Sequence, residues 1–180
     1  MTDDQSALID GEDQEYDDLF GGQRLPSLFN KTHGVGTSLT GIITKPPTKR
    51  QSRFYKAGGK GALKFWAPPG SDKPVTDKAV NADGTKNRPA MDELFILQTE
   101  YQMNEAELAD KDMDEDTGER GFFASGASKT AIQAAIREAG IKNRAGLVGY
   151  RLTMTRTGKT VKGDFEVWKW AAKLESTVPF

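Results

Sequence analysis

Residues 121–158 read GFFASGASKTAIQAAIREAGIKNRAGLVGYRLTMTRTG, and this stretch decides the fold. Its first six residues suit a short extended segment, and Ser128 can cap a helix over residues 129–140. Apolar side chains recur there at helical spacing, and Gly140 suits the helix end. Residues 146–158 then alternate between the two faces of a strand. One face would carry Val148, Tyr150, Leu152 and Met154.

Apolar stretches before and after this segment predict four further strands. They cover residues 37–44 (TSLTGIIT), 62–66 (ALKFW), 92–101 (DELFILQTEY) and 165–174 (FEVWKWAAKL). Gly41 inside the first stretch indicates a bulge or a sharp bend. The resulting order is three strands, one helix and two strands, which is the order of the OB-fold, a small Greek-key barrel. We therefore predict a mainly β protein with a five-stranded OB-fold barrel.

The predicted barrel domain covers residues 31–175. Residues 1–30 lack periodicity and are acidic, which predicts a mostly disordered arm, and residues 176–180 form a C-terminal tip. The acidic start differs from the basic start of a signal peptide. No apolar run approaches the roughly 20 residues that span a bilayer. We expect a soluble cytoplasmic protein without a membrane partner.

The composition excludes several kinds of site. The 180 residues include no cysteine, so disulfides and thiolate metal sites are excluded, and His33 is the only histidine. The net charge is −1, yet residues 1–20 carry −8, residues 21–99 carry +8, residues 100–119 carry −8 and residues 120–180 carry +7. Such separation of charge points to a polyanionic partner or to an internal mimic of one.

Positive charge is densest over residues 41–66, which hold seven bases, four aromatic residues and no acid. OB-folds bind oligonucleotides through the loops between strands one and two and between strands four and five. Here these loops are KPPTKRQSRFYKAGGKG (45–61) and RTGKTVKGD (156–164). Single-strand binders combine a positive groove with rings on which bases stack. The alternative is a solvated basic loop.

The candidate nucleic-acid contacts fall into two groups. Phosphates would be contacted by Lys45, Lys49, Arg50, Arg53, Lys56, Lys60, Lys64, Arg151, Arg156, Lys159 and Lys162. Bases would stack on Phe54, Tyr55, Trp66 and Trp168. For Trp168 a second interpretation stays open, because it shares a strand face with Trp170 and that face could pack into the core.

Two weaker motifs do not predict chemistry. GKT at residues 158–160 lacks the upstream glycine of a phosphate-binding loop, where Thr153 stands instead, and suits a hairpin turn. The alternating Asp110, Asp112, Asp114 and Asp116 suggest a calcium loop, but Thr117 occupies the glycine position. We predict a solvated acidic loop, no bound metal and no catalytic residue.

Four stretches in this order resemble the single-stranded DNA-binding proteins of phages that infect actinobacteria. They are GTSLTGIIT, DELFILQTEY with its acidic loop, GERGFFASGASKTAIQAAIREAG and LVGYRLTMTRTG. The resemblance covers roughly residues 36–174. It implies an OB-fold, binding of single strands without strong sequence preference, a role in replication or recombination, no cofactor and the host cytoplasm.

Bacterial single-stranded DNA-binding proteins end in an acidic run and a Pro-Phe pair that recruits partner enzymes. The sequence ends with Pro179-Phe180, with Glu175 as the only nearby acid. We expect single-stranded DNA as the partner, with replication or recombination proteins docking on the acidic arm or the tip, and a second copy of the chain as a further candidate. Two other classes stay open: an adaptor that docks proteins, and a metal-dependent nuclease that uses the acidic loop.

Overall fold

The computed structural model describes residues 25–30, 32–52, 62–66, 74–76, 84, 87–162 and 165–177. Within them the chain is mainly β, as predicted, with few helices. The strands are β1 (Ser38–Ile43), β2 (Thr48–Gln51), β3 (Lys64–Trp66), β4 (Pro74–Thr76), β5 (Arg88–Pro89), β6 (Met91–Gln98), β7 (Glu119–Ala124), β8 (Tyr150–Lys162) and β9 (Phe165–Ser176). The helices are α2 (Glu105–Asp110), α3 (Gly126–Glu138) and the 3-10 turn η1 (Ala145–Leu147).

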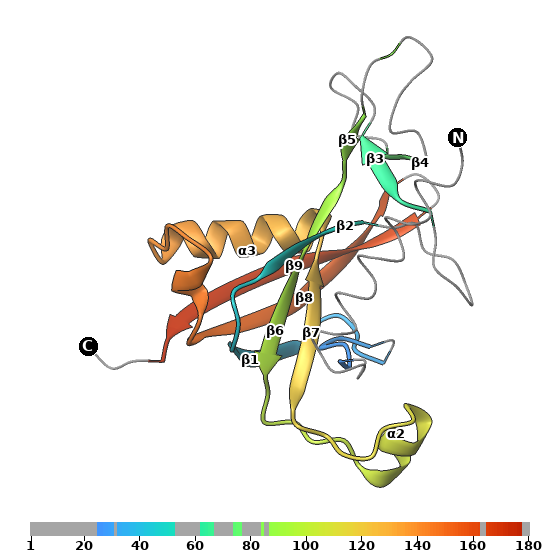
Figure 1. Cartoon of the computed structure of the whole chain (residues 1–180), viewed down its shortest axis with the longest axis vertical. Helices are drawn as coiled ribbons and strands as arrows, with labels where there is room; N and C mark the ends of the chain where they lie inside the picture. Colours follow the sequence, from blue (N-terminus) through green and yellow to red (C-terminus); the bar gives the residue numbers. More distant parts are fainter. Residues whose placement is uncertain are drawn as a thin grey trace.

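One antiparallel sheet forms the body of the molecule (Figure 1). Its strands run in the order β2-β6-β1-β8-β9, and β7 pairs with the other edge of β6. The long strands therefore follow the order β7-β6-β1-β8-β9. Among the described residues β7 does not pair with β9, so the sheet is not a closed barrel. The predicted number of five strands is too low, because the described residues contain four further strands, β2, β4, β5 and β7.

Strand β1 lies between β8 and β6, and its pairing passes from β8 to β6 along its length. Residues 38–42 pair with β8, while Ile42 and Ile43 pair with the end of β6. Gly41 makes this possible, since a Cβ atom there would lie 2.8 Å from the Cβ of Leu97. A bulge or a sharp bend was predicted at Gly41; the register to β8 is continuous there, which excludes the bulge, and the glycine marks a close approach of two strands.

Helix α3 packs beside β9 and covers one end of the core (Figure 1). It begins at Gly126, three residues before the predicted start, because Ser125 and not Ser128 is the N-cap residue. The Ser128 hydroxyl instead accepts from the Ser125 amide and donates to the Ser125 carbonyl. At the other end Gly140 takes a φ of 70°, as expected for the residue that follows a helix.

The segment before β1 belongs to the fold. The amide of Leu28 donates to Gly121 in β7, and the Gly121 amide donates to Pro26. Phe29 is buried between Phe122 of β7 and Trp170 of β9, at centroid distances of 6.1 and 4.9 Å. This segment therefore fills the opening between the two unpaired end strands. The predicted domain start at residue 31 is wrong, because residues 25–30 already pack into the core.

The long connection from β2 to β6 carries a separate small sheet of order β4-β3-β5. Three backbone hydrogen bonds join its base to the large sheet. Ser52 donates to Ala90, Ala90 donates to Lys64 and Lys64 donates to Ser52, with distances of 2.7, 3.1 and 2.8 Å. We call this arrangement the Ser52–Lys64–Ala90 triangle. It closes the connection at its root, where Phe65 is buried.

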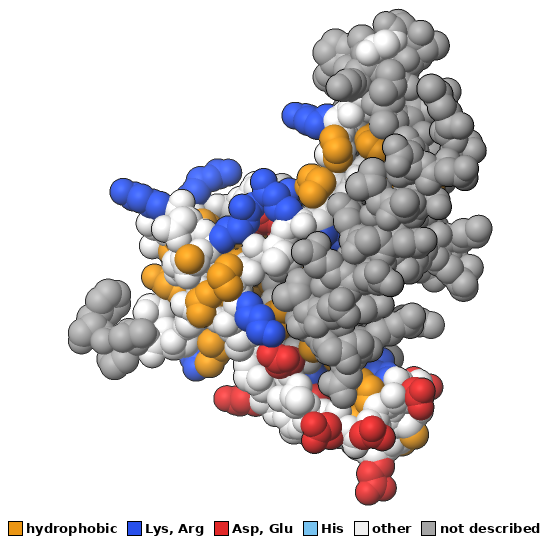
Figure 2. Space-filling model, in the orientation of Figure 1, with side chains coloured by type: hydrophobic (Ala, Val, Ile, Leu, Met, Phe, Trp, Pro, Cys, Tyr) orange, Lys and Arg blue, Asp and Glu red, His pale blue; other side chains and the backbone are white. Residues whose placement is uncertain are grey.

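The acidic connection from β6 to β7 is folded, which corrects the predicted solvated loop. Asn104 and Glu107 form a capping box at the start of α2. The side chain of Asp116 is almost fully buried and accepts two hydrogen bonds of 2.7 and 2.6 Å from the guanidinium of Arg120. It also accepts from the amides of Met103 and Gly118. Figure 2 shows acidic side chains gathered around α2, at the opposite end from the small sheet.

Candidate nucleic-acid interface

The structure describes only part of the predicted interface. Five of its residues, Arg53, Phe54, Tyr55, Lys56 and Lys60, lie outside the described residues. Trp66 and Lys162 belong to β3 and β8, but their side chains also lie outside that part. The other eight predicted residues do not line one groove.

Lys45, Lys49, Arg50 and Lys64 place their side chains at different points of the fold. Lys45 is exposed in the turn between β1 and β2, and Lys64 lies at the Ser52–Lys64–Ala90 triangle. Lys49 and Arg50 are neighbours on β2, opposite Glu93 and Asp92 of β6. Since successive strand residues point to opposite faces, Lys49 and Arg50 face opposite sides of the sheet. A shared groove for both is therefore excluded.

Arg50 reaches an aromatic ring that was not predicted as a contact. Phe122 of β7 points into the core, so its neighbour Phe123 points away from it and is 43% exposed. The guanidinium carbon of Arg50 lies 4.9 Å from the centre of the Phe123 ring. Strands β2, β6 and β7 thus carry an exposed ring with a cation above it, on the face opposite the core.

Arg156 corrects the prediction of a phosphate contact. It is only 8% exposed, and its terminal nitrogen Nη1 donates to the carbonyls of Asn30 and His33. Its guanidinium lies 4.8 Å from the ring of Phe29 and 4.2 Å from that of Trp168. Burial lowers the pKa of Arg156. The side chain holds the N-terminal segment on β8 and is not available to a polyanion.

The second predicted binding loop is largely strand. β8 continues to Lys162 and β9 begins at Phe165, so residues 156–162 form one arm of a long β-ribbon and not a turn. The register shifts by one residue between Arg156 and Gly158. This bulge puts Lys159 opposite Trp168 and on the same face as Arg156.

Two cations therefore lie close to the half-buried Trp168 ring. The Arg156 guanidinium is 4.2 Å from its centre and the Lys159 ammonium is 4.6 Å from it. Lys159 is exposed and also contacts Glu166 at 3.1 Å. Trp170, Ala172 and Leu174 on the same face pack against the core. The interpretation that this face packs inward is thus correct for Trp170, while Trp168 keeps part of its ring accessible.

No family model matches this chain. No curated protein and no solved structure matches it either. None of the described helices has both the length and the apolar character of a membrane span. Across the described residues, no three His, Asp or Glu side chains are grouped so as to hold a metal ion.

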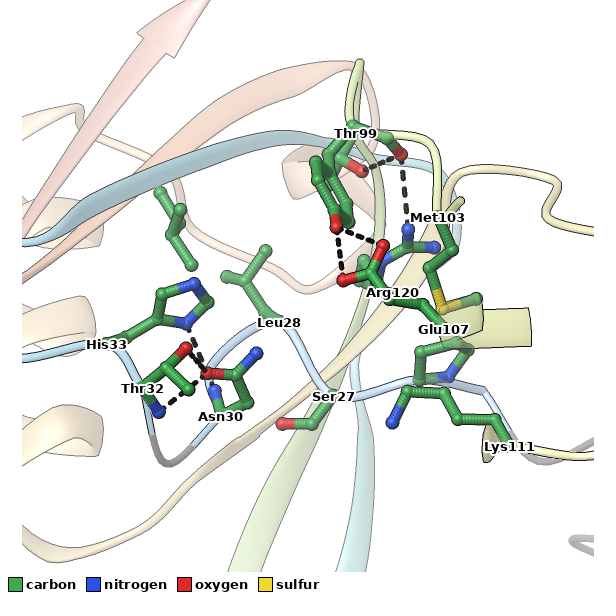
Figure 3. Close-up of a pocket in the computed structure, with 13 residues that line it drawn as sticks. Ser27, Leu28, Asn30, Thr32, His33, Thr99, Met103, Glu107, Lys111 and Arg120 are labelled. Carbon is green, nitrogen blue, oxygen red and sulfur yellow. Dashed lines mark hydrogen bonds between the residues drawn. The ribbon is translucent and has the colours of Figure 1, made fainter. Parts of the chain in front are cut away.

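A cavity of about 280 Å³ lies where the N-terminal segment meets the β6–β7 connection (Figure 3). Leu28 and His33 line one side, and Glu107 and Arg120 line the other. The carboxylate of Glu107 accepts from the Tyr101 hydroxyl at 2.6 and 2.7 Å, and this bond lowers the pKa of Glu107. Arg120 is paired with Asp116. The charged groups of the cavity thus stabilise the connection itself.

Proposed function

We propose that this protein binds single-stranded DNA without strong sequence preference and protects or organises single strands during replication or recombination. The proposal includes an OB-type arrangement. The order β7-β6-β1-β8-β9 places β1 between two hairpins, with α3 on the connection between them. β6 and β7 then correspond to the second and third strands of an OB-fold, whose surface binds oligonucleotides.

The observation that carries the proposal is the pairing of Phe123 with Arg50 on this surface. Phe123 lies outside the core and is 43% exposed, so part of its ring can be contacted by a base. A base stacked on such a ring contributes about 1–3 kcal/mol to binding. The neighbouring guanidinium can bind phosphate or stack on a base. Trp168 with Lys159 repeats this combination on the β8–β9 ribbon.

The test is a titration of fluorescent oligonucleotides, single-stranded and duplex, with and without magnesium. We expect preferential binding of single strands, without cleavage. If about six phosphates are neutralised at a slope of ~0.7 each, affinity should fall about 300-fold between 50 and 200 mM salt. A flat salt profile, equal affinity for the duplex or magnesium-dependent cleavage would contradict the proposal.

A further inference from the structure

The outward side of the sheet, which carries Phe123 on β7, continues over β1, β8 and β9, and no contact described above involves this part of it. Register places three rows of side chains on it. They are Ser38, Thr40 and Ile42 from β1, Arg151, Thr153 and Thr155 from β8, and Lys169, Ala171, Lys173 and Glu175 from β9. We call it the hydroxyl–lysine face. The alternate residues Leu152, Met154, Ala172 and Leu174 point to the core, which fixes the direction of this face.

Four hydroxyl side chains on the hydroxyl–lysine face form two hydrogen-bonded pairs, and each pair keeps one hydroxyl hydrogen that is not used within the pair. Ser38 and Thr155 share a hydrogen bond of 2.7 Å between their hydroxyls, and Thr40 and Thr153 share one of 2.8 Å. In each pair one hydroxyl donates to the other. The accepting hydroxyl keeps its own hydrogen, so each pair presents one O–H donor to an external acceptor.

The charge of the face is positive. Arg151, Lys169 and Lys173 are exposed, and Glu175 is its one acid among the described residues. Lys173 contacts Glu175 at 2.8 Å. Basic side chains interspersed with hydroxyl donors and with no exposed ring are suited to the sugar–phosphate backbone, which is recognised by Arg, Lys, Ser and Thr. The charge thus favours a polyanion over a second copy of the same basic face.

We propose that the hydroxyl–lysine face is a second nucleic-acid contact, which binds the phosphate backbone of a strand that leaves the Phe123 and Trp168 rings with their cations, called the aromatic surface below. This inference rests on the proposed function. Lys159 and Trp168 lie on one face of the β8–β9 ribbon, and Lys169 and Lys173 lie on the other. A strand that passes around the ribbon contacts both faces, so the full site is longer than the aromatic surface alone.

The test compares two double variants that remove the same charge. Lys169→Ala/Lys173→Ala changes the face, and Arg137→Ala/Lys142→Ala changes two exposed positions, one in the last turn of α3 and one in the connection after it. The first should lower the salt slope of single-strand binding by about 1.4, at ~0.7 per lost contact, and the control should not. In a series of oligonucleotides of rising length, the first variant should also reach its maximal affinity at a shorter length than wild type.

A third variant tests the face by gain of binding. Glu175→Gln removes its acid and releases Lys173, so affinity at low salt should rise several-fold. If wild type binds single strands and the two double variants have the same salt slope, the inference is wrong and the proposed function stands. Absence of any wild-type binding would overturn both. If Ala171→Arg converted a dimer into a monomer without changing DNA binding, the face would join two copies and the inference would be wrong.

Discussion

The ring of Phe29 stands edge-on to the indole of Trp170, with centroids 4.9 Å apart and planes at 90°. The two residues come from opposite ends of the fold, one before β1 and one in the last strand. Their contact bridges β7 and β9, which do not pair with each other. The N-terminal segment therefore substitutes for the strand pairing that would close the sheet.

Phe29→Ala should destabilise the protein by about 3–5 kcal/mol, the usual cost of removing a buried phenylalanine ring. The same contact supports Arg156, so the loss extends to the β8–β9 ribbon. Urea unfolding followed by circular dichroism measures the change. Val35→Ala is the control, since Val35 is 59% exposed a few residues later. Equal midpoints for the two variants would mean that the segment does not contribute to the core.

Arg156 and Lys159 should separate stability from binding. Arg156→Gln leaves the carbonyls of Asn30 and His33 without their donor, which should cost about 2–3 kcal/mol of folding free energy. Lys159→Gln should change stability by less than about 0.5 kcal/mol, because its side chain is exposed. Only Lys159→Gln should reduce the salt slope of DNA binding. If instead Arg156→Gln reduced the salt slope and Lys159→Gln did not, Arg156 would be a phosphate contact after all.

Asp116 predicts a specific pH dependence of stability. The Arg120 guanidinium holds the pKa of Asp116 well below its usual range, and amide donors add to this. A depressed pKa contributes stability that is present above the ordinary value near 4 and is lost as pH falls below it. Asp116→Asn leaves the buried Arg120 charge unpaired and should cost about 3–5 kcal/mol at pH 7.

The difference in free energy of unfolding between wild type and Asp116→Asn should narrow below about pH 4, because wild type then takes up a proton at Asp116 on unfolding that the lowered pKa excludes in the folded state. Urea unfolding at pH 7, 5 and 3 measures it. The control is Asp114→Asn, an exposed position in the same connection, which should match wild type throughout. A constant difference at all three values would contradict the assignment.

Phe123→Ala and Trp168→Ala should each weaken single-strand binding by about 1–3 kcal/mol with little change in the salt slope. Stacking removes no counterion from the strand, whereas contacts between lysine and phosphate do. Val161→Ala on the same ribbon is the control, since Val161 is 70% exposed and has no ring. Trp168→Phe should restore most of the binding. Wild-type affinity in both alanine variants would remove the aromatic surface from the site.

Local periodicity predicted the long elements well. The apolar run at residues 92–101 is β6, and the 3.6-residue pattern after Ser128 lies in α3. Both signals come from residues that bury one face of their own element. Phe123 could not be separated from Phe122 in the same way. Which of two adjacent phenylalanines faces outward depends on the register with β6, a long-range property.

Other contacts depended on distant partners that no local pattern reveals. The segment PSLFN is too short for any periodicity, yet Leu28 and Phe29 are core residues because β7 and β9 leave space for them. The register shift after Arg156 decides which lysine meets Trp168. In the acidic connection, Arg120 follows Asp116 by four residues. This nearby opposite charge is the sequence feature that could have distinguished the buried carboxylate of Asp116 from the solvated carboxylates around it.

The Ser52–Lys64–Ala90 triangle has a consequence for engineering. Its hydrogen bonds hold the two ends of the long connection together beside the large sheet. Residues added to the connection beyond the triangle therefore do not change the distance between the end of β2 and the start of β6. Doubling the length of a flexible loop costs only about 0.6 kcal/mol. Gly84 is exposed, and a Cβ atom added to it would meet no heavy atom within 4 Å. A foreign peptide or reporter inserted after Gly84 should therefore be carried by the protein with its sheet intact.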